Sequence, residues 1–217
     1  MSTLAVLKAE IADDLPRSDL TTQIAAAITS AIEHYKTTRF YFNESRSTTF
    51  STVASQSEYT STDHANIPLF FIIDEVYVKP SGGTAIPIDK EDPNEIEYSI
   101  AGGSTGQPYL WSWFDQSIRL FPIPDVATYT IRVIGALEKA APGSDSELSN
   151  VWMVEAYELV RCRAKWYLYG HVIHDAQKAA EMGGPDGEGG AIAAALRKLR
   201  SDTNRKRGRG IIRSTQF

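Results

Sequence analysis

Hydrophobic residues near the beginning of the chain recur at helical spacing. Thr3 is a suitable N-cap for a first helix, which Pro16 is expected to end. Ser18 or Asp19 is suited to cap a second helix, whose apolar positions continue to about Phe42. The pattern therefore predicts two helices in the first 44 residues.

Helical spacing returns in the last third of the chain. Between Val151 and about Ala180, aromatic and aliphatic residues fall on more than one face, which predicts a helix buried over much of its circumference or shared with a neighbouring subunit. The glycine-rich stretch 183–190 interrupts this pattern. A final helix is predicted from Ala191 to about Leu199.

Between these helical ends the pattern changes to short runs typical of strands. The predicted strands are Thr48–Val53, Ile72–Val78, Ile118–Phe121 and Tyr129–Ile134. Two of them alternate between apolar and polar residues, as expected for a half-buried antiparallel sheet. Turn signals occupy 80–83 and 122–125, and a short helix is predicted over 92–100.

Together these elements predict an α+β protein. The N- and C-terminal helices, residues 1–44 and 149–200, are expected to form one helical bundle domain. Residues 45–148 form an inserted antiparallel β module, and residues 201–217 form an extended, basic C-terminal tail.

Composition favours a folded protein from a reducing compartment. Hydrophobic residues make up 42% of the 217 residues and aromatic residues 10%, which is enough for a sizeable core. Cys162 is the only cysteine, so an internal disulfide is excluded, and its apolar context predicts a buried, inert thiol. Because the beginning of the chain lacks a signal-peptide pattern and no window is apolar enough for a membrane span, we expect a soluble protein that is not secreted through a cleaved signal peptide.

Charge is unevenly distributed along the chain. From Arg197 onward there are eight of the 22 basic residues and one of the 27 acidic residues, so this stretch carries +7 and the remainder −12. Such asymmetry predicts a segment that docks on an acidic surface or on nucleic acid. The same segment contains Ile211, Ile212 and Phe217, which a purely solvated tail would not need.

No stretch of the chain carries a complete catalytic motif. The glycine-rich stretch has Gly184 and Gly189 at phosphate-loop spacing, but Gly190 and Ala191 replace the lysine and hydroxyl residue that such a loop requires. A turn between helices is the better interpretation. The acidic pairs at 13–14, 74–75 and 91–92 lie in polar sequence, where solvated carboxylates are expected. No enzymatic activity and no cofactor are predicted.

Two further groups of residues have alternative interpretations. His171 and His174 lie three residues apart and could share one helical face, but two ligands make a weak metal signal, so no metal site is predicted. The aromatic run Tyr109–Phe114 could stack nucleic-acid bases. It lacks interleaved lysine or arginine, so core packing or a subunit contact is favoured.

Three segments, taken together, resemble a known family. They are AIEHYKTTRFYFNE at 31–44, TGQP at 105–108 and IRLFPIPD at 118–125. With the order of elements and the basic tail, they resemble the head-to-tail adaptor proteins of tailed bacteriophages, also called connector or head-completion proteins.

This resemblance implies a structural virion protein of the neck, which is assembled in the host cytoplasm. Its members form a ring, usually dodecameric, beneath the portal protein; they extend the DNA channel, offer a platform for tail or nozzle proteins, and have no catalytic residues. The C-terminal segment reaches onto the portal, which here implies docking by Arg205, Lys206, Arg207, Arg209, Ile211, Ile212, Arg213 and Phe217. Packaged DNA would pass without specific binding, since an acidic wall does not retain phosphates.

Two other functions remain as hypotheses at this point. The basic tail, with its Arg-Gly-Arg-Gly sequence, could bind nucleic acid. An enzyme with an unrecognised site has no positive support. The adaptor hypothesis explains the body, the insertion and the tail, whereas nucleic-acid binding explains the tail alone.

Overall fold

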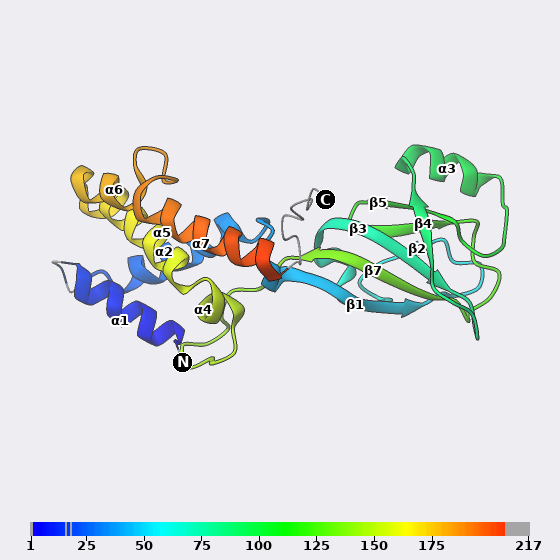
Figure 1. Ribbon diagram of the computed structural model, residues 1–217, viewed down its shortest axis with the longest axis horizontal. Helices are drawn as coiled ribbons and strands as arrows, with labels where there is room; N and C mark the ends of the chain where they lie inside the picture. The colour runs from blue at the N-terminus through cyan, green and yellow to red at the C-terminus, as the bar shows by residue number, and fades with distance from the viewer. Residues whose placement is uncertain (1, 16, 18, 207–217) are drawn as a thin grey trace, which may run out of the picture. The chain divides into compact units, whose positions relative to one another are not determined.

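The computed structural model describes residues 2–15, 17 and 19–206. The predicted helix stop at Pro16 and the candidate cap Ser18 lie outside the described residues. The chain has two compact units (Figure 1): unit 1 combines the beginning of the chain, through Phe42, with the part from Lys139 onward, and unit 2 is 43–138. The fold is mixed α+β, with a seven-stranded sheet in unit 2.

The first helix begins where the sequence predicts. Helix α1 (Leu4–Asp14) has Thr3 as its N-cap, and the Thr3 hydroxyl accepts a hydrogen bond from the Val6 amide at 3.2 Å. Leu7 and Ile11, one turn apart, are fully buried. This face attaches the helix to the core of unit 1.

The second helix is shorter than predicted. Helix α2 (Thr21–Tyr35) has no side-chain cap, because the Asp19 carboxylate instead binds the Arg17 guanidinium at 2.6 and 3.0 Å. The chain leaves the helix where the Thr38 amide donates to the Tyr35 carbonyl, and a 3-10 turn (Tyr41–Asn43) follows. The predictions that Asp19 caps this helix and that it extends to Phe42 were therefore wrong.

The single long helix predicted from Val151 to Ala180 is divided into four pieces. They are α4 (Val151–Glu155), α5 (Tyr157–Tyr167), a π-helix (Leu168–Ile173) and α6 (Ala176–Gly183). His174 takes the left-handed conformation, with φ of 60°, which ends the π-helix. Asp175 then caps α6 by accepting from the Lys178 amide at 3.0 Å.

The glycine-rich stretch forms the turn between α6 and the last helix, as predicted. At Gly190 φ is +49°, and a Cβ there would lie 2.1 Å from the Glu181 carbonyl oxygen, so only glycine fits. Helix α7 (Gly190–Lys206) is longer than the predicted 191–199. Residues 201–206, predicted to be extended tail, are helical, and 207–217 lie outside the described residues.

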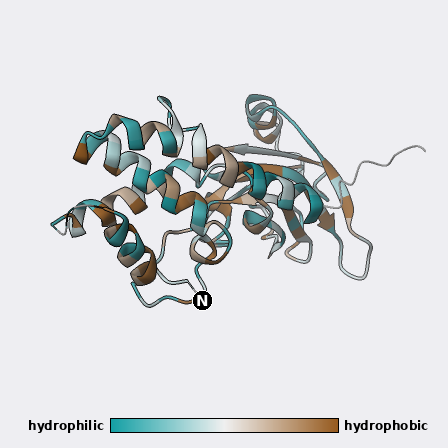
Figure 2. Cartoon of the chain, turned by 60° about the vertical axis from the view of Figure 1, so that its left-hand side comes forward, coloured by the Kyte–Doolittle hydropathy of each residue, from teal (hydrophilic) through white to brown (hydrophobic). Residues whose placement is uncertain are grey.

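The helices from both ends of the chain share one hydrophobic core in unit 1. Helices α2 and α5 lie side by side (Figure 1). Apolar positions recur along each helix (Figure 2), and the buried ones include Leu7, Ile28, Ile32, Trp152, Leu159, Val160, Leu168 and Ile192. Burying each such side chain contributes about 1.5–3 kcal/mol.

An ion network fixes α1 against α5. The Asp14 carboxylate accepts from the Arg161 guanidinium at 2.7 Å and from the Lys165 ammonium at 3.0 Å. Arg161 also lies 3.4 Å from Glu10, one helical turn before Asp14. The hydrogen bond from Arg161 is the main cause that lowers the pKa of Asp14 below its ordinary value, and Lys165 adds to it.

We predict that Asp14→Asn reduces the free energy of unfolding at pH 7 by about 1 kcal/mol, a modest value because the pair is partly solvated. The folded-state pKa of Asp14 is depressed, so its stabilisation is present above the unfolded-state pKa and is lost as the pH falls through the folded-state pKa. Urea unfolding at pH 7 and pH 3 should show a larger difference between variant and wild type at pH 7 than at pH 3. The exposed neighbour Asp13→Asn is the control, and an equal loss in both variants would contradict the prediction.

Unit 2 is one sheet whose strand order is β1-β7-β3-β4-β5-β6-β2. The strands are β1 (Glu44–Ser51), β2 (Glu58–Tyr59), β3 (Phe70–Lys79), β4 (Ile86–Lys90), β5 (Leu110–Phe114), β6 (Ser117–Phe121) and β7 (Thr130–Leu137). The four predicted strands correspond to β1, β3, β6 and β7, whereas β2, β4 and β5 were missed. A 3-10 turn (Ile67–Leu69) precedes β3.

The sheet is not wholly antiparallel, which corrects the prediction. Strands β4 and β5 are parallel, with Asp89 opposite Leu110. The cause is the connection between them: helix α3 (Pro93–Ala101) carries the chain back to the starting edge of β4, as parallel pairs require. The predicted short helix is thus confirmed, with Asp92 as its cap and Ile96 fully buried.

The sheet curls until its two end strands meet. Phe50 of β1 and Tyr59 of β2 belong to opposite ends of the strand order, yet their ring centroids are 5.0 Å apart. The Tyr59 hydroxyl also accepts from the Val53 amide at 3.1 Å. The apolar residues of the inner face, among them Trp111, are thereby enclosed in a second core.

Strand β7, which pairs with both β1 and β3, carries a glycine that allows close approach of β3. A Cβ on Gly135 would lie 2.2 Å from the Ile72 carbonyl oxygen of β3. The pairing register shifts beside this position on both sides, between Ser45 and Thr48 in β1 and between Ile73 and Glu75 in β3. The two irregularities therefore flank one glycine.

Candidate docking site

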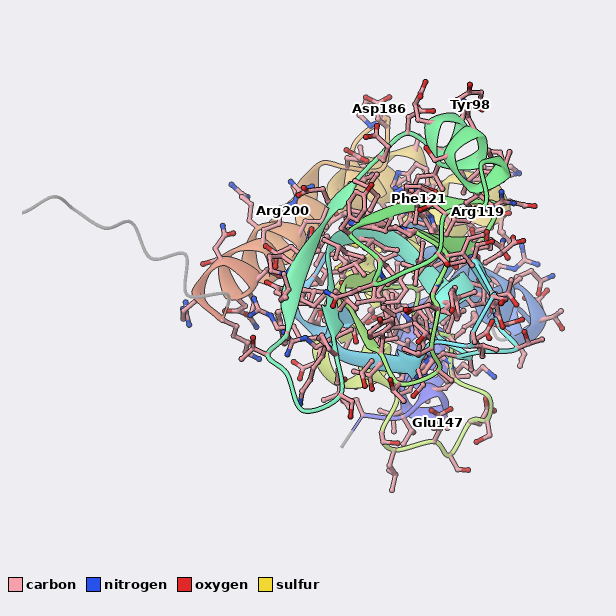
Figure 3. The ribbon with its side chains drawn as sticks, turned by 90° about the vertical axis from the view of Figure 1, so that its right-hand side faces the viewer. Tyr98, Arg119, Phe121, Glu147, Asp186 and Arg200 are labelled. Atoms are coloured by element: carbon pink, nitrogen blue, oxygen red, sulfur yellow. The ribbon has the colours of Figure 1, made fainter. Side chains whose placement is uncertain are left out.

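The described part of the predicted docking segment is the last turn of α7. Arg205 and Lys206 are exposed there, and the outer face of the second half of the helix also carries Arg197, Lys198 and Arg200. Arg200 projects away from the helix (Figure 3). Cations near a helix C-terminus interact favourably with the partial negative charge of the last carbonyls, so this helix end tolerates a high positive charge.

Tyr41 holds the end of α7 in place. The Lys206 ammonium lies over the Tyr41 ring, 3.7 Å from its centroid. The Tyr41 amide donates to the Thr203 hydroxyl at 3.2 Å, and that hydroxyl donates to the Leu199 carbonyl at 2.8 Å. The residues that follow Lys206 therefore continue from an anchored position.

The Tyr41 hydroxyl is a permanent donor in this arrangement. It hydrogen-bonds the Glu155 carboxylate of α4. Burial is the main cause that raises the pKa of Tyr41 well above its ordinary value, and the hydrogen bond to Glu155 adds to it. The phenol therefore stays protonated and ties the 3-10 turn to α4 at any physiological pH.

A groove of about 260 Å³ lies beside this anchor, between α7 and the helices α4 and α5. The charged residues that line it are Glu155, Glu158, Lys198 and Asp202. Val154, at the margin of the groove, is 53% exposed. The end of α7 thus has both a charged surface and a small apolar one available to a partner.

The structure locates only part of the predicted site. Six of its eight residues lie outside the described residues: Arg207, Arg209, Ile211, Ile212, Arg213 and Phe217. Sequence analysis missed the anchoring residues Tyr41, Thr203 and Glu155. The aromatic run Phe40–Phe42 was a usable signal, because three consecutive aromatic residues cannot all lie on one face of a helix.

The glycine-rich turn is fixed by side chains of α5. The Trp166 indole donates to the Gly184 carbonyl at 3.0 Å, and the Arg163 guanidinium donates to the Gly187 carbonyl at 2.5 Å. Arg163 also lies over the Trp166 ring, 4.5 Å from its centroid. The backbone of the turn accepts hydrogen bonds from the protein, which suits a structural turn.

The other candidate residues have local roles. His171 stacks on Tyr167, with centroids 4.8 Å apart, and His174 ends the π-helix. In the part of the chain that the structure describes, no three His, Cys, Asp or Glu side chains are placed to hold a metal ion. Burial raises the pKa of the Cys162 thiol, so it is a poor nucleophile at neutral pH.

The aromatic run Tyr109–Phe114 consists of Tyr109 and strand β5, and it contributes to the core. The Trp111 ring is 1% exposed, and its indole donates to the Ile88 carbonyl at 3.1 Å. Tyr109 and Phe114, at the ends of the run, are 55% and 63% exposed. The centre of the run is thus core, while its two ends remain available for contacts.

The described end of α7 is thus a charged helix end that Tyr41 anchors. In a comparison with known families, residues 2–214 match the SU10 adaptor protein family. The chain belongs to this family, which is a family of phage head-tail adaptors. A search among curated proteins gave no match.

Membership of the family indicates the general role of the chain. The SU10 adaptor proteins are structural phage proteins, and their role implies interaction with portal and tail components in the neck of the virion. None of the helices within the described residues is long and apolar enough to cross a membrane.

Proposed function

We propose that this chain forms a ring of twelve copies, the usual number in the family, beneath the phage portal. The ring extends the DNA channel and joins the capsid to tail or nozzle proteins. The family match over residues 2–214 is the observation that carries this proposal. A ring repeats one heterologous interface until it closes, so each copy needs two different contact surfaces. The helical unit, a bundle built from both ends of the chain, is the part we assign to ring formation.

The C-terminal segment, residues 205–217, is proposed to dock on the portal. Its cations would pair with acidic groups, and its apolar residues would fill pockets there. The anchored last turn of α7 supports this assignment, because it presents Arg205 and Lys206 at a fixed place. A segment that starts from a fixed point loses less conformational entropy on binding than one attached to a mobile helix end.

The charge of the remaining chain suits a DNA channel. Residues before Arg197 carry a net charge of −12. A wall of this sign does not bind phosphates, so packaged DNA would pass without being retained. The proposed function requires no catalytic residue and no cofactor.

Electron microscopy of the protein mixed with its portal tests the proposal. We expect a closed ring that shares the portal axis, with every copy touching two neighbours. Portal particles carrying isolated copies without neighbour contacts would overturn the ring.

Nucleic-acid binding is the second candidate, and the exposed cations of α7 favour it. Titration of the protein with duplex DNA and with portal at the same salt concentration separates the two. Adaptor function predicts tighter binding to portal, whereas the alternative predicts tighter binding to DNA and a steep salt dependence.

A further inference from the structure

Unit 1 has a second, larger groove beside α6, which the proposed function does not use. It has a volume of about 550 Å³ and runs between α6, the π-helix and the turn before α7. Its lining includes Trp166, Gly170, His174, Ala176, Ala180 and Pro185. We call it the α6 groove. Most of these side chains are small or apolar, so the groove suits an apolar group of appreciable size.

The walls of the α6 groove are fixed. Trp166 is bound through its indole to Gly184, which also lines the groove. A Cβ on the adjacent Gly183 would lie 2.7 Å from the Trp166 ring, so α6 and this ring are already in close contact. Such a groove does not collapse when empty, and its occupant gains the full benefit of burial.

Three acidic residues lie on the elements that form the α6 groove, close in sequence to its lining residues, and we call them its acidic border. Glu181 is on α6, and Asp186 and Glu188 are on the turn whose Gly184 and Pro185 line the groove. All three are exposed. Asp186 projects away from the backbone (Figure 3). The nearby cations are already engaged, Lys178 with Asp175 and Arg163 with Gly187.

The chain itself contains a segment with the complementary chemistry. Residues 207–217 combine Arg207, Arg209 and Arg213 with Ile211, Ile212 and Phe217. Charge and apolar character thus match the acidic border and the apolar floor of the groove.

Chain length decides which of these residues reach the groove of their own copy. Helix α7 begins beside the groove and ends at Lys206, about 24 Å away at 1.5 Å per residue. An extended chain covers about 3.4 Å per residue, so Ile211 reaches only about 17 Å from Lys206. Arg213 reaches about 24 Å and Phe217 about 37 Å.

We propose that, in the free protein, the segment after Lys206 folds back along α7, with Phe217 in the α6 groove of the same copy and Arg213 against its acidic border. The proposal rests on the proposed function, in which the same segment docks on the portal. Portal and groove would then compete for Phe217, and the segment would be released only where a portal is present. Docking on the wrong partner, or on another copy, is thereby suppressed.

Disulfide trapping in the full chain tests this. In a Cys162→Ala background, Ala180→Cys places a thiol in the groove and Gln216→Cys places one beside Phe217. Under mild oxidation at micromolar concentration, we expect a cross-linked monomer to form at least about 10-fold faster than with the exposed control Ala26→Cys in place of Ala180→Cys. Circular dichroism confirms that each variant is folded.

Charge reversal adds an independent measurement. Glu181→Lys with Glu188→Lys should slow the cross-link several-fold, while Asp13→Lys, on α1, should leave it unchanged. Cross-linked dimers would show that the groove takes the segment of a second copy, and equal rates at Ala180 and Ala26 would show that it takes none; either result overturns the proposal. Portal binding by the unoxidised variants is measured separately, so failure of the fold-back is distinguishable from failure of portal docking.

Discussion

Removing residues 207–217 is expected to weaken binding to the portal at least about 100-fold, while the rest of the chain stays folded. The structure places the cut after Lys206, because Arg205 and Lys206 belong to the anchored last turn of α7. Truncation at this point keeps the contacts of Tyr41 with Thr203 and Lys206. Calorimetric binding to purified portal, together with thermal unfolding of both proteins, measures the two effects.

Matched substitutions separate the roles of the apolar and charged residues. Ile211, Ile212 and Phe217→Ser should act mainly by faster dissociation, because buried apolar anchors supply lasting affinity. Arg207, Arg209 and Arg213→Gln should slow association, and this effect should shrink as salt is raised. Arg17→Gln, in the connection between α1 and α2, is the control. Normal docking by the truncated protein would refute the role of the segment.

Gly135→Ala is expected to destabilise unit 2 by about 3 kcal/mol, roughly a 150-fold change in its unfolding equilibrium. The added Cβ would lie 2.2 Å from a backbone oxygen of β3 and 3.0 Å from the Ile73 Cα, and backbone atoms cannot rotate away as a side chain does. Relief requires strands β7 and β3 to separate locally, which disturbs the hydrogen bonds beside the register shift.

Hydrogen exchange of the β7 amides measures this loss within the full chain, and amides of α5 report whether unit 1 is affected. Gly83→Ala is the control, since its nearest neighbours would be at 3.4 Å and its backbone is not left-handed. Similar protection of β7 in the two variants would show that the close approach to Ile72 costs little.

The sequence pattern correctly predicted elements that depend on local sequence alone. The prediction failed for elements whose boundaries depend on tertiary contacts. Thr3 caps α1 as expected, because a cap needs only its own residue and the next turn, and the short helix predicted over 92–100 is present as α3. Asp19 does not cap α2, because Arg17, two residues away, binds its carboxylate. Strand β4 contains Pro87 and has few apolar residues, and β2 has only two residues, so neither carries a recognisable alternation.

The sequence around His174 also gave little indication that the helix ends there. Histidine is not a helix breaker, and the apolar pattern continues on both sides of it. The candidate site was also only partly predictable. The cations could be identified from the charge distribution, but the partner of Lys206 is Tyr41, which lies 165 positions earlier in the chain. Pairings of such separation follow from the fold and are not readable from local pattern.

The division of unit 1 between the two ends of the chain has a consequence for synthesis on the ribosome. Helices α1 and α2 emerge first, but their partners α5 and α7 are made only after the whole of unit 2. At about 5–20 residues per second, the apolar faces of α1 and α2 wait roughly 8–30 s for those partners. Unit 2 is contiguous, so its core closes during that interval. The nascent chain should therefore pass through a state with a folded insertion and two uncovered helices, which a host chaperone that binds apolar segments would recognise.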